Sequence, residues 1–313
     1  TQAAALLDAT ERGARAAFRA IGPGTWKATD VMEDDGVGHG PFRIRLAVTI
    51  TRRGDIRFDF AGTDDQAPGG INAPLAVTRS ACLYVARCLA GEAVRSMNGG
   101  LSRAVAVMAP VGCLVRPRPG APVAGGNIET SQRVVDVALS ALSAAVPDRI
   151  PAASAGTMSN LGLGGTCSDG TQWAHYETLG GGMGAGRHGG GLSGTQTHMT
   201  NTRNTPIEVL EGQAPVMVER LALRRGSGGR GARKGGEGIV KAFRFTAAAT
   251  ISVLADRHVS GPHGASGGGP GRPGAVHLIR DGRTRRLASK TVLDVRPGDV
   301  IRLTSPGGGG WGG

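Results

Sequence analysis

The sequence has few aromatic residues, few cysteines and no long apolar run, and each shortage excludes a class of protein. Phe, Tyr and Trp make up 4% of the 313 residues, too few for the stacking face of a single-strand nucleic-acid binder. The four cysteines form no CxxC pair and show no disulfide-framework spacing. No stretch approaches the length of a membrane span, and no signal peptide precedes Thr1. We therefore expect a cytoplasmic protein.

The basic residues are also unusual, because only four of the 36 are lysines. The net charge of +12 would suit nucleic-acid binding, but the arginines are scattered and no aromatic residues are interleaved with them. We do not expect nucleic-acid binding. Genome composition or an acidic partner chain explains the charge better.

Hydrophobic periodicity predicts an α+β protein in two parts. A mixed α/β part covers residues 1–215, and a mainly antiparallel, β-rich part covers residues 216–313. The first part should contain a helix over 1–21, a hairpin of strands 42–50 and 56–60, short strands at 104–108 and 113–116, and helices after Pro74 and Asn127, with Asn127 as N-cap and Cys82 and Cys88 buried. The second part should contain strands 216–224, 239–246, 250–255, 275–280, 285–293 and 299–304.

The most informative stretch is residues 173–211, where the glycine-rich segment 180–194 precedes a polar run. Hydrogen-bonding side chains fill the run: Thr195, Thr197, His198, Thr200, Asn201, Thr202, Arg203, Asn204 and Thr205. With no apolar face, it cannot be an ordinary core strand or helix. It either forms a polar pocket floor or a surface loop that satisfies its own backbone. A pocket floor would end at a helix beginning near Pro206, capped by Asn204 or Thr205, whose N-terminus suits an anion.

Two further glycine-rich polar segments, 125–133 at the start of a helix and 156–165 in an expected loop, could converge with residues 180–205 on one cleft. Several stretches, in order along nearly the whole chain, resemble the hydantoinase B/oxoprolinase family: FDFAGTDDQAPGGINAPLAVTRSA, GGNIETSQRVVD, SAGTMSNL, HYETLGGGMGA, THMTNTRNTPIEVLE, ISVLADR and RPGDVIRLTSPGGGGWG. That family includes the B subunits of ATP-dependent N-methylhydantoinases, 5-oxoprolinases and acetone carboxylases.

The sequence departs from the family in one respect. Family members carry a long segment before the equivalent of the first helix, with Asn-Asp-Pro…Gly-Gly-Thr-His…Asp and His-His-x-Asp-x-Gly motifs that resemble metal ligands. Neither motif occurs here, so the resemblance implies the C-terminal half of a B subunit. It implies two partner chains, a hydantoinase A-type ATPase subunit and the N-terminal half of the B subunit, with a divalent metal on that half. This chain lacks a GxxxxGK[ST] loop, so we expect ATP to be used by the A subunit.

The activity that the resemblance implies is hydrolysis of a cyclic amide (hydantoin, oxoproline or another lactam) through a phosphorylated intermediate. One alternative is a carboxylase of the acetone-carboxylase type that acts on a ketone. Another is a non-catalytic half that completes the fold of a metal-bearing N-terminal partner. We expect no metal ligands in this chain.

Candidate site residues follow from their surroundings in the sequence. His198 is the first candidate for proton transfer, because it lies within the polar run. Glu177 is the second, because it directly precedes the glycine-rich segment, and we expect His175 on the opposite face of that strand. Arg203 would stabilise a carboxylate or an oxyanion. The remaining candidates, for substrate binding, are Asn201, Thr202, Asn204, Asn127, Glu129, Arg133 and Asn160. Each of these residues could equally belong to a buried polar network that fixes loop shape.

Overall fold

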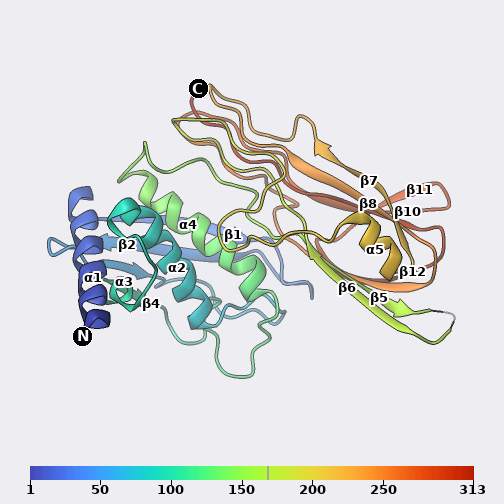
Figure 1. Ribbon diagram of the computed structural model, residues 1–313, viewed down its shortest axis with the longest axis horizontal. Coiled ribbons are helices and arrows are strands. Elements are labelled where there is room, and N and C mark those ends of the chain that lie inside the picture. Colours follow the sequence, from blue (N-terminus) through green and yellow to red (C-terminus); the bar gives the residue numbers. More distant parts are fainter. Residues whose placement is uncertain (168) are drawn as a thin grey trace. The chain divides into compact units, whose positions relative to one another are not determined.

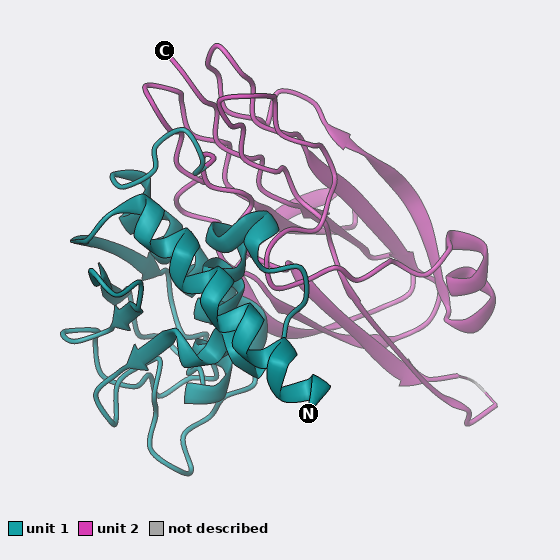
Figure 2. Cartoon of the chain, turned by 60° about the vertical axis from the view of Figure 1, so that its left-hand side comes forward, with its two compact units in different colours: residues 1–150 teal, residues 151–313 magenta. Residues whose placement is uncertain are grey.

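The computed structural model describes residues 1–167 and 169–313, which form two compact units, residues 1–150 and residues 151–313 (Figure 2). The first unit combines helices with a mixed sheet, and the second consists mainly of antiparallel strands, which confirms the predicted α+β class. The division expected after residue 215 falls inside the second unit. Within the described residues, no helix is long and apolar enough to cross a membrane.

The first unit is built on a four-stranded sheet in the order β1-β2-β3-β4 (Figure 1). Its strands are β1 (Gly24–Met32), β2 (Phe42–Ile50), β3 (Ile56–Asp59) and β4 (Val105–Met108). Its helices are α1 (Gln2–Ile21), α2 (Leu75–Ala90), η1 (Gly91–Ala93), α3 (Gly99–Arg103), the π-helical turn η2 (Gly126–Thr130) and α4 (Ser131–Ser143). Neighbouring strands are antiparallel except β3 and β4, and α4 packs against β1, β2 and α2.

The β2–β3 hairpin forms because its apolar residues alternate with polar ones. Ile44, Leu46 and Val48 on β2 are buried, and Val48 pairs with the buried Phe58 on β3. All four side chains therefore lie on the core face of the sheet. Burying a side chain of this size contributes roughly 1.5–3 kcal/mol. The hairpin predicted from the sequence is confirmed.

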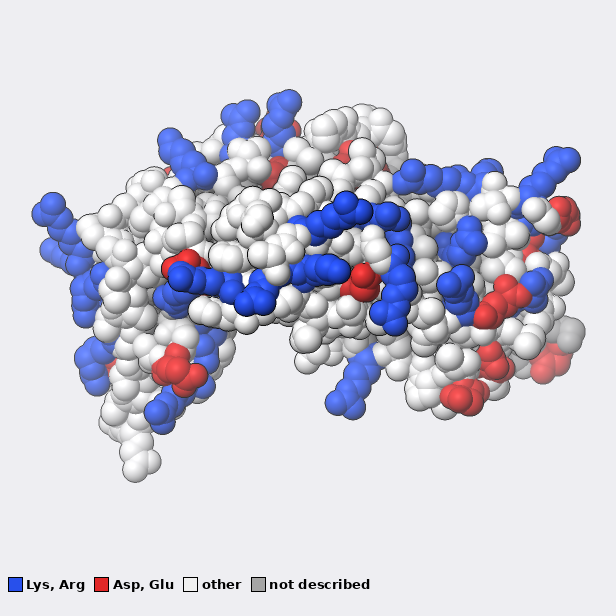
Figure 3. Space-filling view, turned by 90° about the horizontal axis from the view of Figure 1, so that it is seen from above, with Lys and Arg blue, Asp and Glu red and all other residues white. Residues whose placement is uncertain are grey.

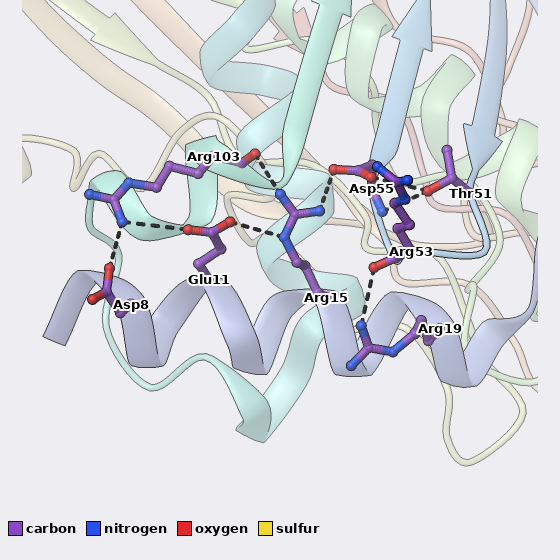
Figure 4. Close-up of polar contacts among 8 residues, drawn as sticks. All are labelled: Asp8, Glu11, Arg15, Arg19, Thr51, Arg53, Asp55 and Arg103. Atoms are coloured by element: carbon purple, nitrogen blue, oxygen red, sulfur yellow. Dashed lines mark hydrogen bonds and ion pairs between the residues drawn. The ribbon is translucent and has the colours of Figure 1, made fainter. Parts of the chain in front are cut away.

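Helix α1 contacts the β2–β3 turn and α3 through polar side chains, and its backbone approaches the turn closely at one point (Figure 4). Arg15 lies between Glu11, whose Oε1 is 3.0 Å from its Nε, and Asp55 in the β2–β3 turn. Arg103 of α3 reaches Glu11 at 3.4 Å. A Cβ at Gly54 in the same turn would lie 2.2 Å from the carbonyl oxygen of Arg15. The turn can therefore touch the helix backbone only because residue 54 is glycine.

The second unit contains two antiparallel sheets, in the orders β11-β10-β13-β8-β7 and β12-β9-β5-β6. Its elements are β5 (Asn160–Thr166), β6 (Gln172–Thr178), α5 (Ile207–Gln213), β7 (Val216–Arg224), β8 (Gly238–Phe245), β9 (Ala249–Leu254), β10 (Ala275–Arg280), β11 (Arg283–Leu287), β12 (Lys290–Val295) and β13 (Val300–Thr304). Leu161 and Ile251 of the smaller sheet share one apolar core with Phe243, Phe245 and Ile301 of the larger sheet. The two sheets thus form a sandwich.

Beside the sandwich, extended segments that belong to no sheet pack through their backbones. We call the segments 180–194, 227–236, 261–274 and 305–313 the glycine bundle. The Gly236 N–H donates to the Met183 carbonyl at 2.9 Å, and the Gly308 N–H donates to the Gly236 carbonyl at 2.9 Å. A Cβ at Gly308 would lie 2.0 Å from the Met183 oxygen. Figure 1 shows these segments running side by side toward the C-terminus. Their glycines permit backbone contact rather than flexibility.

Several local expectations are wrong. Residues 113–116 form a turn with isolated bridges instead of a strand, and the strand expected over 285–293 is two strands, β11 and β12. Most of the segment 156–165, expected as a loop, is strand β5, paired with β6 and β9. Asn127 lies exposed in the π-helical turn, so it does not cap α4, and Cys88 is exposed.

Candidate functional site

A buried ion pair joins the two sheets of the second unit. The Nζ of Lys241, on β8, lies 2.8 Å from each carboxylate oxygen of Glu177, on β6. The side chains are only 2% and 4% exposed. Lys241 also lies 4.9 Å above the ring of Phe243. Both charges are thus matched within a largely apolar interior, where an unmatched charge is very costly.

His175 belongs to the same cluster as Glu177. Its Nε2 lies 3.3 Å from Oε2 of Glu177. The expectation that the two residues occupy opposite faces of the strand is wrong, because side chains two positions apart on a strand share a face. Glu177 therefore contacts an imidazole and an ammonium group at once.

Lys241 is a residue of this cluster that the sequence analysis does not predict. Its strand alternates, so that Ile239, Phe243 and Phe245 turn toward the core with Lys241 between them. A lysine at an inward position of an apolar alternating strand signals a buried partner of opposite charge. That signal is present in the sequence, but the partner, 64 positions away in the chain, is not apparent from it.

The polar loop, residues 195–205, is fixed to the last residue of β6. The side-chain amide of Gln196 donates to Oγ1 of Thr178 at 3.0 Å, and the amide of Asn204 donates to the Thr178 carbonyl at 2.9 Å. At the start of the loop, Thr195 and Gly181 exchange backbone hydrogen bonds of 2.8 and 3.0 Å. The glycine bundle and β6 thus hold the loop beside Glu177.

Asn160 lies at the same end of the smaller sheet, where it pairs with Thr178 across β5 and β6. Its Nδ2 donates to the Leu254 carbonyl at 2.8 Å, and its Oδ1 accepts from the hydroxyl of Tyr176. Asn160, Glu177 and Asn204 therefore all lie near the end of β6, but alternation along the strand places the side chains of Asn160 and Tyr176 on the opposite face from Glu177.

His198 adopts a left-handed backbone conformation, with φ of 60°. A non-glycine residue with positive φ is uncommon and indicates that the surrounding structure constrains it. The residue keeps some solvent exposure but lies deep among protein atoms. This burial lowers the pKa of His198 to about 4, because it disfavours the charged imidazolium. The ring is therefore neutral at pH 7.

Arg203, Asn201 and Thr202 are exposed on the polar loop. The helix that follows has Pro206 at its N-cap with no side-chain hydrogen bond, so the cap expected at Asn204 or Thr205 is wrong. The Asn204 amide instead bonds to β6. The exposed guanidinium of Arg203 can still approach a ligand carboxylate or oxyanion from the loop.

The second predicted group lies in the first unit. Asn127 is exposed, whereas Glu129 and Arg133 are fully buried on the π-helical turn and on α4. Arg133 Nη1 lies 3.3 Å from Asp30 on β1 and 3.5 Å from Asp136 on its own helix. These contacts tie α4 to the sheet. Convergence of this group with the polar loop stays a prediction.

A metal site needs several convergent ligands. Among the residues that the structure describes, no group of three or more His, Cys, Asp or Glu side chains could hold an ion. The resemblance places the divalent metal on the N-terminal half, outside this chain, and no chemical step is derived through one.

The fold and the cluster at the end of β6 define an α+β protein with a glycine-supported polar loop beside a buried carboxylate. The hydantoinase B/oxoprolinase family model matches residues 1–313, and the chain belongs to that family. 5-Oxoprolinase 1 of Arabidopsis thaliana is 41% identical over 290 residues, which are 92% of this chain and 22% of that protein. A Pseudomonas protein named as the B-type component of a D-/L-hydantoinase is 30% identical, over 98% of this chain and 53% of that protein.

Two solved structures share the fold. The ATP-dependent caprolactamase of Pseudomonas jessenii gives a TM-score of 0.83 at 25% identity, over 98% of this chain and 54% of that one. A nucleotide-free acetone carboxylase gives a TM-score of 0.83 at 16% identity, over 97% and 47%, and shows the fold alone. The chain thus spans from about a fifth to about half of the length of these relatives.

Proposed function

We propose that the chain is the C-terminal half of a hydantoinase B-type subunit that hydrolyses a cyclic amide through a phosphorylated intermediate, together with an ATP-using A subunit. Relatives named 5-oxoprolinase, hydantoinase and caprolactamase support this, because oxoproline, hydantoin and caprolactam are all cyclic amides. The caprolactamase is the one among these three that is named as ATP-dependent.

The observation that carries the proposal within this chain is the polar loop anchored beside Glu177. Ring opening of an activated lactam needs a group that takes a proton from the attacking water. The imidazole of His198 is neutral at pH 7, the form that a base needs, although the burial that lowers its pKa also makes it a weaker base. His198 is accordingly assigned as the proton acceptor.

Negative charge that develops on the opening ring needs donors held in place beforehand. Arg203 is assigned to the developing oxyanion or to a substrate carboxylate, and Asn201, Thr202 and Asn204 to polar contacts with the ring. The anchoring of Asn204 to Thr178 at 2.9 Å limits the freedom of the loop, and thus the entropy lost on binding. Asn160 supports the same end of β6. In the first unit the exposed Asn127 stays a candidate for substrate binding, whereas Glu129 and Arg133 are fully buried there.

Glu177 is assigned to catalysis through the cluster that it forms with His175 and Lys241. Lys241 occupies both of its carboxylate oxygens and holds the carboxylate in one position. The Nε2 of His175 lies 3.3 Å from the same carboxylate, so the cluster contains three polar side chains in contact.

The partners and cofactors belong to the proposal as well. A hydantoinase A-type ATPase would use ATP, and a separate N-terminal B-type chain would supply the divalent metal, which acts as a Lewis acid when bound. The B-type relative and the solved structures, about twice as long as the matched region, are consistent with such a second half.

The test is reconstitution of this chain with an A-type ATPase and an N-terminal B-type chain. Hydantoin, 5-oxoproline and caprolactam are supplied with ATP, and the ring-opened products and ADP are quantified. Ring opening that is coupled to ADP release supports the proposal. Carboxylation of acetone in place of ring opening would favour the ketone carboxylase.

The non-catalytic alternative is tested in the same assembly with His198→Ala and Arg203→Ala. If both variants retain normal turnover in an active assembly, this chain only completes the fold. In that case the assignment of catalysis to the polar loop is wrong.

A further inference from the structure

The outer face of the five-stranded sheet carries a row of basic side chains. The strand register places Arg286, His277, Arg302, Ala242 and Arg220 next to one another on β11, β10, β13, β8 and β7. In the middle of the sheet the apolar residues next to His277, Arg302 and Ala242 along their strands belong to the apolar core, so the row faces away from it; these core residues are Val276, Leu278, Ile301, Leu303 and Phe243. With strands about 4.8 Å apart, the backbones of successive arginines in the row lie about 10 Å apart.

Two more arginines adjoin the row. Arg224, farther along β7, donates to the carbonyl of Pro273 at 2.6 Å, and it lies close enough to Arg272 for the two charges to interact. Burial lowers the pKa of His277, and the charges of Arg302, Arg286 and Arg224 lower it further. The potential over this face is therefore positive. We call Arg220, Arg224, Arg272, Arg286, Arg302 and His277 the basic face.

The basic face lacks matching acids within the described part of the chain. The nearby carboxylates are already occupied, Glu219 by Arg244 and Asp299 by Arg280. Among the described residues, no carboxylate forms an ion pair with the five arginines of the face: Arg220, Arg224, Arg272, Arg286 and Arg302. Figure 3 shows that Lys and Arg outnumber Asp and Glu on the surface it draws, in keeping with the net charge of +12.

We propose that the basic face binds an acidic surface of a partner protein. Guanidinium groups pair with carboxylates through two parallel hydrogen bonds, and a regular row of them suits carboxylates on a helix or strand. The register also places small residues on this face, namely Ala222, Ala242 and Ala275. Single-stranded nucleic acid is the poorer fit, because the described residues of this face include no Phe, Tyr or Trp on which successive bases could stack.

The test uses the full chain and two defined polyanions, poly-L-glutamate and a single-stranded dT oligonucleotide of matched charge. Binding is measured by fluorescence anisotropy at low and at moderate salt. The variant R220E/R286E/R302E reverses the face. The control variant R12E/R52E/R95E makes the same change in net charge at arginines of the first unit. Circular dichroism checks the fold, and R220Q/R302Q serves as a milder variant in case the triple variant unfolds.

Poly-L-glutamate should bind about tenfold or more weakly to the face variant and nearly normally to the control, with the milder variant in between. Equal weakening by the control would show a net-charge effect and overturn the proposal. Tighter binding of the oligonucleotide through the same arginines would replace the acidic protein with nucleic acid. Absence of binding to poly-L-glutamate would also overturn it.

Discussion

Two regions of the second unit reach a dense interior by opposite means. The sandwich is filled by large side chains such as Phe243 and Ile301 and encloses the ion pair of Glu177 with Lys241. In the glycine bundle backbones meet directly, so that an added Cβ at Gly308 would overlap the Met183 carbonyl. Packing in the sandwich depends on which side chains fill it, whereas packing in the glycine bundle depends on glycines, which have no side chain.

This difference bears on function, because the polar loop lies between the two regions. Thr195 bonds to the bundle through Gly181, and Asn204 bonds to the sandwich through Thr178. A loop without an apolar face cannot fold by its own burial. Its shape is therefore set by a rigid support on each side.

The largest expected effect on stability comes from breaking the sandwich at its ion pair. Lys241→Met leaves Glu177 buried without a counter-charge and should lower the free energy of unfolding by about 3–5 kcal/mol. Urea titration measures this. The double variant K241M/E177Q removes both charges and should recover most of the loss. A double variant as unstable as the single one would show that packing, and not charge, holds this position.

The next largest effect tests the bundle. A Cβ at Gly191 would lie 1.8 Å from the Met183 oxygen, whereas a Cβ at Gly189 would meet nothing within 4 Å. Gly191→Ala should cost about 3 kcal/mol, while Gly189→Ala should cost little. Thermal melts of the two variants make the comparison within one loop. Equal melting temperatures would contradict direct backbone packing.

A smaller effect depends on pH and reports on the polar loop. The pKa of His198 is about 4 in the folded chain and near its ordinary 6.5 when unfolded, so unfolding takes up a proton below pH 6.5. Stability from this residue is complete above pH 6.5 and is lost as the pH falls to about 4. His198→Gln should flatten the stability curve in that range. If His198→Gln leaves the dependence of the free energy of unfolding on pH unchanged, the imidazole is exposed to solvent and not buried.

The smallest effect is expected at the ion pairs of α1, which are exposed to solvent, unlike the buried pair of Lys241 and Glu177. Arg103 donates to Asp8 at 2.8 Å, and both side chains are about half exposed. Arg103→Ala should change the free energy of unfolding by about 0–1 kcal/mol. A urea titration showing a loss as large as that of Lys241→Met would mean that exposure does not govern these pairs.

The sequence predicts the periodic elements well and the backbone-packed ones poorly. The β2–β3 hairpin and α2 follow from alternation and from helical spacing, since their apolar side chains mark the buried face. Strand β5 is not predicted, because Gly162, Gly164 and Gly165 give no side-chain pattern. For the same reason the sequence does not reveal the bundle as packed structure.

Prediction of the site is limited for a different reason. The composition of the polar loop marks it, and the place of Glu177 before the glycines marks that residue. Lys241 escapes prediction because its pairing depends on how two strands distant in sequence face each other. The roles of His198 and Arg203 depend on contacts with a ligand, which neither composition nor periodicity can specify.

The most direct test of the central claim is the turnover of His198→Ala in the reconstituted assembly, with the mass of the complex measured in parallel by native mass spectrometry. The account predicts a fall in kcat of about 10²–10⁴-fold, as for loss of a general base, with an intact complex. Near-normal turnover in an intact complex would contradict the assignment of proton transfer to the polar loop.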